Sequence, residues 1–525
     1  MKIIINSISK NRKLLLSVFS MILLLALLAA CTNTGTTGAG TTAGSASTTA
    51  NAEPMKLTWI GYMGGGWTAI KDTAVEKMIE EKFNVDIDVV EIDSASSEAA
   101  TLYFANGGKA DYMLGYGLSV RKFVEQGLCQ ELNFDEMMSN LPDWMESVVP
   151  QIGGLDAMKK LIALDGKYYF IPWTRYDYAS TEGLNIRKSW LDAADLDVPE
   201  TVDDIYEMFV AFTKDDPDGN GKDDTYAYSA TTYGFGIIEG AFGGHTKDSY
   251  YVDDTGSVQY SGIQSYYKEA LKFYRKLYDE GLIDPEFMTD DRPKMWEKWG
   301  NGLYGCMTLD PYMLNQNQAT KLLLDNNPGE EIVYVANLSD SSGKALPAKG
   351  YIPLDLQAMI GVDTSAEKRM KIYEIINAIV ADTEFGLSVQ YGPKDTGWKY
   401  GDDDKVVNLL ADDVDASRAN GAYYFGIVPA GVKQMPLFFS DKIIGFFETS
   451  LAAPKYIPGR SYDLFPITSE AFNTKSADVS TLSNEFYFNA ITGKFDIDAE
   501  WDNYVASIKG AGVDDILAEF QSKVS

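Results

Sequence analysis

The spacing of hydrophobic positions predicts alternating strands and helices in the first part of the chain. Residues 56–60 read as a buried strand, and Val75, Met78 and Ile79 recur at helical spacing before residues 86–92 alternate like a second strand. A strand, a helix and a strand in this order are the usual opening of an α/β lobe. We therefore predict an α/β fold.

Later hydrophobic patterns predict further helices. Residues 267–278 carry one apolar helical face, and Gly281 lies where a C-terminal cap is expected. A second helix is predicted from about Thr364, with Glu367 completing a capping box. Residues 501–520 predict two helical patches broken at Gly510 and Gly512. The core face of the helix that follows Thr364 is predicted to consist of Ile372, Ile375, Ile376 and Ile379.

An acidic loop follows a helix that the pair Thr201 and Asp204 is predicted to cap. Within residues 216–225, side chains with oxygen atoms recur at alternate positions, and Gly221 lies where a calcium loop needs a sharp turn. The last position of such a loop should be a bidentate Glu but is Ala227, so we expect a static calcium site rather than a sensor. The alternative is a metal-free surface turn, since Asp, Asn and Gly favour turns. The predicted ligands are Asp216, Asp218, Asn220, the backbone carbonyl of Lys222, and Asp224.

The N-terminus has the features of a targeting segment. Basic residues precede an apolar stretch, residues 14–28, that is too short for a confident membrane span. Small residues then lead directly to Cys31, which resembles the lipobox of bacterial lipoproteins and implies cleavage before Cys31 and diacylation of its thiol. The alternative is an ordinary signal peptide. Residues 31–54 read as a flexible tether, so we expect a globular body lipid-anchored at the extracytoplasmic face of the cell membrane.

Length and charge restrict the architecture and the partners. A chain of 525 residues is too long for one core, so we predict at least two lobes. The formal net charge of −31 argues against binding to nucleic acid or to an anionic membrane surface. It also argues against a strongly anionic ligand, although a local basic pocket would override this.

Aromatic residues and the scarcity of histidine bear on the chemistry. The chain has 32 Tyr and 9 Trp, whose apolar faces and polar edges suit sugars, although large extracellular domains are often rich in aromatic residues. A single histidine, His245, argues against a histidine-based triad or a multi-histidine zinc site. Cys129 and Cys306 either form a disulfide or remain as two buried thiols.

Several short segments, in their order and spacing, resemble one family. Together they are similar to a family 1 extracellular solute-binding lipoprotein of a carbohydrate ABC importer, in the long Gram-positive subgroup that includes alginate- and oligosaccharide-binding proteins. The segments are the residues ending at Cys31, the turn Asp165-Gly166-Lys167 leading to Pro172, residues 186–191 and 199–201, the acidic loop, and residues 277–283 and 501–505.

The resemblance implies a two-lobe periplasmic-binding-protein-like fold with an interlobe cleft that closes by hinge motion of the crossovers. The expected lobes are residues 55–170 with about 305–395, and residues 171–304 with about 396–525, after a signal peptide at 1–30. The family implies calcium at the acidic loop, and Thr225, which stands where alginate-binding relatives have an acid, is the last predicted ligand. The chain is expected to be a monomer whose partners are an oligosaccharide and the transmembrane subunits of an ABC permease.

Ligand-binding residues in such folds follow the carboxyl ends of strands. A Trp or Tyr face packs against a sugar ring, and Asp or Arg bonds to its hydroxyls. Trp59, Trp190 and Trp501 are predicted to be core residues, whereas Trp296 and Trp299 either line the cleft or pack. The predicted ligand-binding residues are Tyr62, Trp67, Tyr116, Trp173, Arg175, Asp310, Tyr312 and Trp398, together with Asp111, which remains from a family motif at a strand start.

The leading hypothesis is a binding protein without catalytic activity that captures an oligosaccharide and delivers it to an importer. Within binding proteins, the alternative ligand is a peptide or another small polar solute. A secreted glycoside hydrolase would need two carboxylates about 5–10 Å apart across a cleft, and no motif singles out such a pair. A structural surface lipoprotein would be expected to show repeats, and none is visible.

Overall fold

The structure is a computed structural model of the chain. It describes residues 53–62, 68–93, 97–116, 119–174, 180–229, 236–316, 318–354, 356–428, 434–457, 460–461, 464 and 467–524. The signal peptide, Cys31, nearly all of the predicted tether, Trp67 and Arg175 therefore lie outside the described residues, and of Tyr116 only the backbone is described.

The first lobe is built on a five-stranded sheet with the order β2-β1-β3-β13-β6. Strands β1 (Met55–Ile60), β2 (Val85–Val89) and β3 (Tyr112–Tyr116) are parallel. Strand β13 (Leu356–Ile360) runs antiparallel to β3 and to β6 (Phe170–Trp173). Every second side chain of β2 is buried, whereas all of β13 is buried, as expected for an edge strand and a central strand. The predicted strand–helix–strand opening is confirmed.

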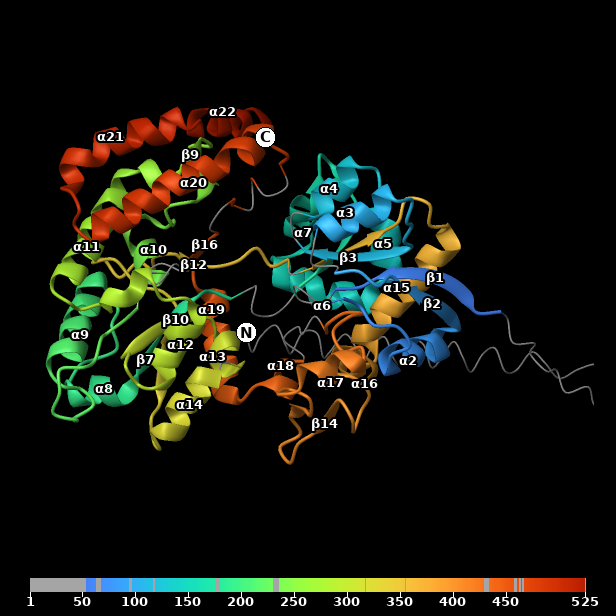
Figure 1. Ribbon diagram of the computed structural model, residues 1–525, viewed down its shortest axis with the longest axis horizontal. Coiled ribbons are helices and arrows are strands. Elements are labelled where there is room, and N and C mark those ends of the chain that lie inside the picture. The colour runs from blue at the N-terminus through green and yellow to red at the C-terminus, as the bar shows by residue number, and fades with distance from the viewer. Residues whose placement is uncertain are drawn as a thin grey trace, which may run out of the picture. The chain divides into compact units, whose positions relative to one another are not determined.

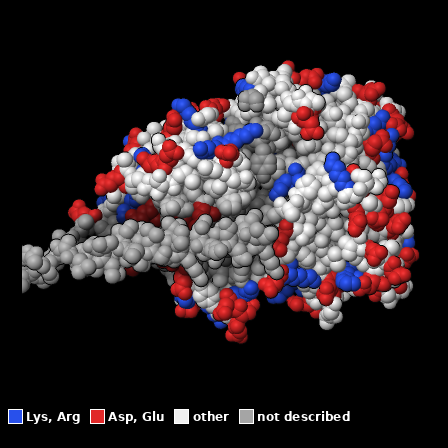
Figure 2. Space-filling model, turned by 180° about the vertical axis from the view of Figure 1, so that it is seen from behind, with Lys and Arg blue, Asp and Glu red and all other residues white. Residues whose placement is uncertain are grey.

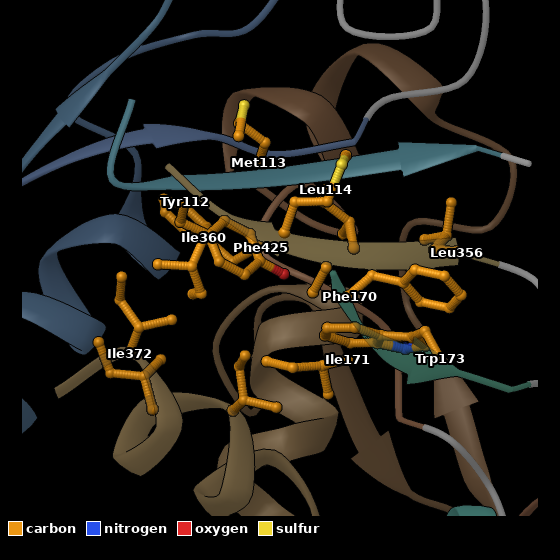
Figure 3. Close-up of a cluster of buried hydrophobic side chains, with 14 of the residues drawn as sticks. Tyr112, Met113, Leu114, Phe170, Ile171, Trp173, Leu356, Ile360, Ile372 and Phe425 are labelled. Carbon is orange, nitrogen blue, oxygen red and sulfur yellow. The ribbon is translucent and has the colours of Figure 1, made fainter. Parts of the chain in front are cut away.

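Helices cover this sheet, with α3 and α4 above it and α2 and α6 below it in the view of Figure 1. The four isoleucines predicted for the core face of α15 (Ala366–Ala381) are all buried, and Figure 3 labels one of them, Ile372. The predicted capping box is wrong, because Ser365 caps α15 and accepts a bond from the Lys368 amide. Thr364 lies one residue earlier and donates to Asp111 instead. The other helices of this lobe include α2 (Ala74–Phe83), α3 (Ser97–Ala105), α4 (Ser119–Glu125), α5 (Phe134–Asn140), α6 (Pro142–Ile152), α7 (Leu155–Ile162) and α16 (Thr383–Tyr391).

The second lobe has a three-stranded antiparallel sheet in which β7 (Gly183–Arg187) lies between β10 (Cys306–Leu309) and β11 (Ile332–Val335). The C-terminal helices pack beside α11 (Ser265–Asp279), as Figure 1 shows. The predicted break after residue 510 separates α21 (Ile497–Gly510) from α22 (Val513–Lys523). The capping box of Thr201 and Asp204 is present at the start of α9 (Val202–Lys214). The longest helix of the lobe is α20 (Glu470–Ile491).

The remaining elements are short or lie at the margins of the two sheets. The hairpins are β4 (Ala163–Leu164) with β5 (Lys167–Tyr168), β8 (Tyr250–Val252) with β9 (Val258–Tyr260), and β14 (Trp398–Tyr400) with β15 (Val406–Asn408), and β12 (Ala348–Lys349) pairs with β16 (Lys455–Tyr456). The helices are α8 (Lys188–Ala193), α10 (Ile237–Gly243), η2 (Ser261–Ile263), η3 (Pro285–Met288), α12 (Arg292–Gly300), α13 (Pro311–Gln316), α14 (Gln318–Asn326), α17 (Val414–Ala419), α18 (Met435–Phe438) and α19 (Asp441–Ala452).

The predicted lobe boundaries need correction. Strands β10 and β11 pair with β7, so the chain after residue 305 belongs to the second lobe rather than the first. Residues 354–389 and 424–428 lie in the core of the first lobe, and residues 464–520 return to the core of the second. Long segments cross between the cores because sheet partners are chosen by tertiary packing, which hydrophobic periodicity does not reveal.

Cys129 and Cys306 are buried free thiols in different cores. Cys129 lies in the first core, whereas Cys306 begins β10 in the second. Burial raises the pKa of the Cys129 thiol to about 12, so the reactive thiolate is disfavoured. The structure therefore favours the second of the two alternatives, two unpaired thiols.

Candidate functional site

The acidic loop folds around the side chain of Asn220. Its Nδ2 donates to Asp218 Oδ2 at 2.8 Å and to Asp224 Oδ1 at 3.0 Å. The carboxylate of Asp216 accepts the backbone N–H groups of Asn220 and Gly221 at 3.1 and 2.9 Å. The loop thus holds two carboxylates against the side-chain amide of Asn220 and a third against backbone N–H groups, and Gly221 has the positive φ of 78° that the turn requires.

This arrangement fits a hard cation. Calcium prefers six to eight oxygen ligands, and exchanging Oδ1 and Nδ2 of Asn220 by an amide flip would add an oxygen facing the carboxylates. Thr225 does not fit as a ligand, because it is buried and its hydroxyl donates to the Phe212 carbonyl at 3.0 Å. We therefore withdraw Thr225 from the predicted ligands, since it anchors the end of the loop to helix α9.

A second group of acids, which the sequence analysis missed, surrounds Lys298. The Lys298 Nζ atom donates to one oxygen of each of Asp284, Glu286 and Asp290 at 2.7 Å. Tyr304 donates to Asp284 Oδ2 at 2.6 Å. The three carboxylates lie close enough together to hold a metal ion, but the lysine ammonium already supplies the positive charge.

Burial opposes the charged form of Lys298, but its hydrogen bonds to the three carboxylates outweigh burial and raise the pKa well above the ordinary value. The lysine therefore remains an ammonium ion at any physiological pH. The signal that could have revealed this cluster is Lys298 on α12 following three acids within fifteen residues, which is too common a pattern to be specific.

Two tryptophans predicted to contact a ligand lie in the protein interior. Trp173 is fully buried, packs among Phe170, Ile171 and Leu356 in Figure 3, and donates from Nε1 to the Ile427 carbonyl at 2.9 Å. Trp398 is also fully buried and donates to Ser388 Oγ at 3.1 Å. The prediction for both residues is wrong, because each indole is satisfied inside the first lobe.

Asp111 is likewise a structural residue. It is buried at the amino end of β3, opposite to the end where ligands bind in such sheets. Its carboxylate accepts from the Thr58 amide at 3.0 Å, from Thr364 Oγ1 at 3.1 Å and from Lys368 Nζ at 2.7 Å. The prediction that Asp111 binds ligand is therefore replaced by a role in joining β1, β3 and α15.

Three other predicted residues follow strand ends, and of these Tyr62 and Tyr312 are half-buried whereas Asp310 is buried. Tyr62 follows β1, is half-buried, and donates its backbone N–H to the Tyr424 carbonyl at 3.0 Å. Asp310 follows β10, and its Oδ1 accepts the Met313 amide at 2.8 Å, which fixes the first turn of α13. Tyr312 lies on that turn, half-buried, with its ring centroid 6.4 Å from that of Phe439.

Trp59, Trp190 and Trp501 are buried, as predicted for core residues. Trp296 and Trp299 on α12, which were expected either to line the cleft or to pack in the interior, differ from one another. Trp299 is fully buried and donates to Thr320 Oγ1 at 3.1 Å, whereas Trp296 is half-buried beneath the guanidinium of Arg292.

Tyr423 is a candidate that the sequence analysis missed. Its φ of 66° is unusual for a residue other than glycine, and the residue is 38% exposed. Its ring centroid lies 5.7 Å from that of Tyr391, at 81°. Backbone strain of this kind is often found at functional sites, but it leaves no signal in the local sequence.

Comparison with known proteins places this architecture in a family. The profile of the family described as bacterial extracellular solute-binding protein matches residues 65–349. The fructooligosaccharide ABC transporter substrate-binding protein FusA of Streptococcus pneumoniae is 24% identical over 483 residues, which cover 84% of this chain and 84% of FusA. The polygalacturonan/rhamnogalacturonan-binding protein YtcQ of Bacillus subtilis is 26% identical over 66% of this chain and 68% of its own. Lipoprotein LipO of Bacillus subtilis is 34% identical over 35% of this chain and 37% of its own.

Solved structures share the fold. The alginate-binding protein AlgQ2, in a structure without calcium ion, has a TM-score of 0.63 at 18% identity and covers 90% of this chain and 98% of its own. An EF-hand mutant of FusA in complex with fructo-nystose has a TM-score of 0.62 at 20% identity and covers 89% and 98%. At these identities the similarity establishes the fold alone, which is the predicted two-lobe α/β fold. With the profile match over more than half of its length, this chain belongs to the bacterial extracellular solute-binding protein family.

Proposed function

We propose that this protein captures an oligosaccharide between its two lobes and delivers it to an ABC importer without altering it chemically. The observation that carries the proposal is the similarity to FusA, a fructooligosaccharide-binding protein, over 84% of the length of both chains. The fold agrees with this function, since three crossovers join two separate α/β cores and permit hinge closure. Known relatives are binding proteins rather than enzymes, as the names of FusA and YtcQ state.

We retain as ligand-contacting residues the predicted ones at strand ends other than Asp111, Trp173, Asp310 and Trp398. Asp310 is proposed to position Tyr312 by capping α13. Direct contact of the Asp310 carboxylate with a sugar is not proposed. Tyr423 is added because its strained backbone presents a partly exposed ring beside Tyr391. The proposed set is Tyr62, Trp67, Tyr116, Arg175, Tyr312 and Tyr423.

Membrane attachment is proposed to depend on a diacylated Cys31. The lipobox pattern around Cys31 supports this, and so does the name of the relative LipO, a lipoprotein. Among the residues described, no helix is both long and apolar enough to cross a membrane. Substitution of Cys31 by Ser should release the protein into the culture medium, as measured by cell fractionation.

The acidic loop is proposed to hold a structural calcium ion. The side chains of Asp216, Asp218, Asn220 and Asp224 and the backbone carbonyl of Lys222 would be the ligands. Calcium would supply the positive charge that these carboxylates otherwise lack. The names of the AlgQ2 and FusA structures support calcium sites in relatives of this fold.

The function is tested by a thermal-melt screen of the chain from residue 53 onward against neutral and acidic oligosaccharides and against peptides. A ligand that binds only the folded state raises the melting temperature. We expect an increase with an oligosaccharide, and we expect chromatography to return that oligosaccharide unchanged. An increase with peptides alone would contradict the sugar proposal, and shortened sugar products would contradict the absence of catalysis.

A matched pair of variants then locates the site. Tyr423→Ala should weaken sugar binding by up to about tenfold, because an aromatic contact contributes about 0.5–1.5 kcal/mol. Tyr206→Ala removes the same side chain from α9, where it bonds Glu280, and should leave the affinity unchanged. Equal affinities for both variants would remove Tyr423 from the site.

A further inference from the structure

Two buried polar side chains at one edge of the first-lobe sheet lack hydrogen-bond partners among the described residues. Thr174 comes directly after β6, and Gln357 is the second residue of β13. Thr174 is 0% exposed and Gln357 is 1% exposed. Within the part of the chain that the structure describes, Oγ1 of Thr174 and Oε1 of Gln357 take part in no hydrogen bond. Leaving a buried polar atom unpaired costs stability and is uncommon in folded proteins, so two such atoms at one edge indicate a partner from outside the chain.

The strand register places the two side chains on the same face of the sheet. Gln357 pairs with Pro172 of β6, and Leu356 pairs with Trp173. Because alternate residues of a strand share a face, Thr174 continues the face of Pro172, on which Gln357 also lies. Thr174 and Gln357 are thus diagonal neighbours, with Cα atoms about 7–8 Å apart and polar side chains that one hydroxyl group can bridge.

The neighbours of Gln357 in the sheet explain why its amide oxygen is unpaired. Gln357 lies between Pro172 of β6 and Gly115 of β3. Pro172 has an apolar side chain and Gly115 has none, so neither offers a side-chain donor. Figure 3 shows Leu356 and Trp173, the chain neighbours of Gln357 and Thr174, within the hydrophobic core. The two adjacent strands therefore place no side-chain donor opposite Gln357.

This edge of the sheet is the one that faces the ligand in folds of this class. The parallel strands β1 and β3 end here, whereas β13, which is antiparallel to β3, begins here. Strand β6 is antiparallel to β13 and therefore also ends at this edge. The carboxyl ends of the strands in an α/β sheet line the crevice in which ligands bind. Thr174 and Gln357 therefore lie on the first lobe's side of the proposed ligand site.

Both side chains are uncharged, which bears on the class of ligand. The chain has 76 acidic and 45 basic residues, and Figure 2 shows acidic side chains spread over much of the visible face. A surface with this balance of charge repels anions. A hydroxyl group both donates and accepts, so it can satisfy an amide oxygen and a threonine hydroxyl together. These properties favour a neutral sugar over an acidic one.

We propose that Thr174 and Gln357 form a subsite for a hydroxyl group of a neutral oligosaccharide bound between the lobes. This inference rests on the proposed function and specifies its ligand class. The sugar hydroxyl donates to Oε1 of Gln357 and accepts from Oγ1 of Thr174, so both buried groups gain a partner. A sugar that lacks a hydroxyl group at this position leaves Gln357 unpaired in the complex and is bound less tightly.

The test measures affinity by titration calorimetry on the full-length protein. The neutral probes are kestose, raffinose and maltotriose, and the acidic probe is trigalacturonate. We expect at least one neutral trisaccharide to bind more tightly than trigalacturonate. Thr174→Val and Gln357→Met each remove a polar group with little change in side-chain volume. Each variant should bind that neutral trisaccharide about fivefold to tenfold more weakly than the unmodified protein does.

The melting temperature separates this role from a structural one. Removal of an unpaired buried polar group should leave the melting temperature of the free protein unchanged or raise it. Gln130→Met is the control, because Nε2 of Gln130 donates to the Gly361 carbonyl at 2.8 Å, at the opposite end of β13. This control should lower the melting temperature and leave the affinity unchanged.

The outcomes separate this inference from the proposed function. Unchanged affinity of either Thr174→Val or Gln357→Met for the neutral trisaccharide overturns the subsite and leaves sugar capture standing. The same conclusion follows if either variant lowers the melting temperature as much as Gln130→Met does. Binding of trigalacturonate alone overturns the neutral ligand class and also leaves sugar capture standing. If none of the four sugars binds, both proposals fail.

Discussion

The acidic loop at residues 216–225 and the acidic cluster around Lys298 differ in the cation that each provides for its carboxylates. Asp284, Glu286 and Asp290 each accept a hydrogen bond from one ammonium group at 2.7 Å. In the loop, the carboxylates of Asp218 and Asp224 face only the neutral amide of Asn220. The carboxylates around Lys298 share one positive charge that their own chain supplies, whereas the proposed calcium site would take its positive charge from an ion in solution.

This difference shows that acidic side chains in proximity do not by themselves identify a metal site. Asp284, Glu286 and Asp290 have ligand atoms within 4.8 Å of one another, which is compact enough for an ion. Lys298 already lies among them, and Asp284 and Asp290 are buried. In the loop, by contrast, the side-chain hydrogen bonds to Asp218 and Asp224 come from the neutral residue Asn220.

The largest effect is expected from Lys298→Met. This change leaves three carboxylates without their ammonium, two of them buried, and should destabilise the protein by about 3–5 kcal/mol in urea unfolding. Calcium or manganese at millimolar concentration should restore part of the stability of this variant. Lys294→Met is the control, because Lys294 lies on the same helix and pairs with Glu297 at the surface. Equal stabilities of the two variants would contradict the role of Lys298.

Glu239 is an acidic residue of a third kind, because burial is the main influence on whether its carboxyl group is charged. Burial is the largest influence on Glu239 and raises its pKa from 4.5 to about 7. A raised pKa in the folded state gives stability that is present below about pH 4.5 and lost as the pH rises to about 7. Glu239→Gln should therefore change little at pH 5 and stabilise the protein at pH 8 by up to about 3 kcal/mol.

The measurement for Glu239 is the free energy of unfolding at both pH values. Glu98→Gln, an exposed change on α3, should give the same difference at pH 5 and pH 8. A stabilisation by Glu239→Gln that does not depend on pH would show that Glu239 is not the titrating group.

Removal of calcium should have a smaller effect. A chelator should lower the free energy of unfolding by about 2.7 kcal/mol if calcium was present at about 100 times its dissociation constant. Asp216→Asn should reduce this response. Asp223→Asn should not, because Asp223 lies between the alternating positions of the loop. A melting temperature that the chelator leaves unchanged would make the loop an ordinary turn.

The smallest effect is expected from Thr225→Val. It removes the buried hydrogen bond to the Phe212 carbonyl and should cost about 1 kcal/mol, equally with and without calcium. Calorimetric titration with calcium checks this, and a weaker calcium affinity in this variant would make Thr225 a ligand after all.

Elements whose signals are local could be predicted from the sequence. The capping box of Thr201 and Asp204, the face of Ile372 to Ile379 and the break after residue 510 are all present as predicted. Each depends on side chains within a few turns of one another, so hydrophobic periodicity and capping chemistry are sufficient. The alternation of oxygen-bearing side chains in the acidic loop is also a pattern within a short segment, so it could be recognised from the sequence.

Properties that depend on contacts between distant residues were decided only by the tertiary structure. Trp173 and Trp398 follow glycine- and proline-marked turns like surface residues, yet both are buried, because Ile427 and Ser388 supply partners for their indoles. The pairing of β7 with β10 and β11 placed residues 306–335 in the second lobe. The ammonium among Asp284, Glu286 and Asp290 likewise has no specific signal in the sequence. Burial and electrostatic environment depend on which segments the whole fold brings together, and local sequence does not encode that choice.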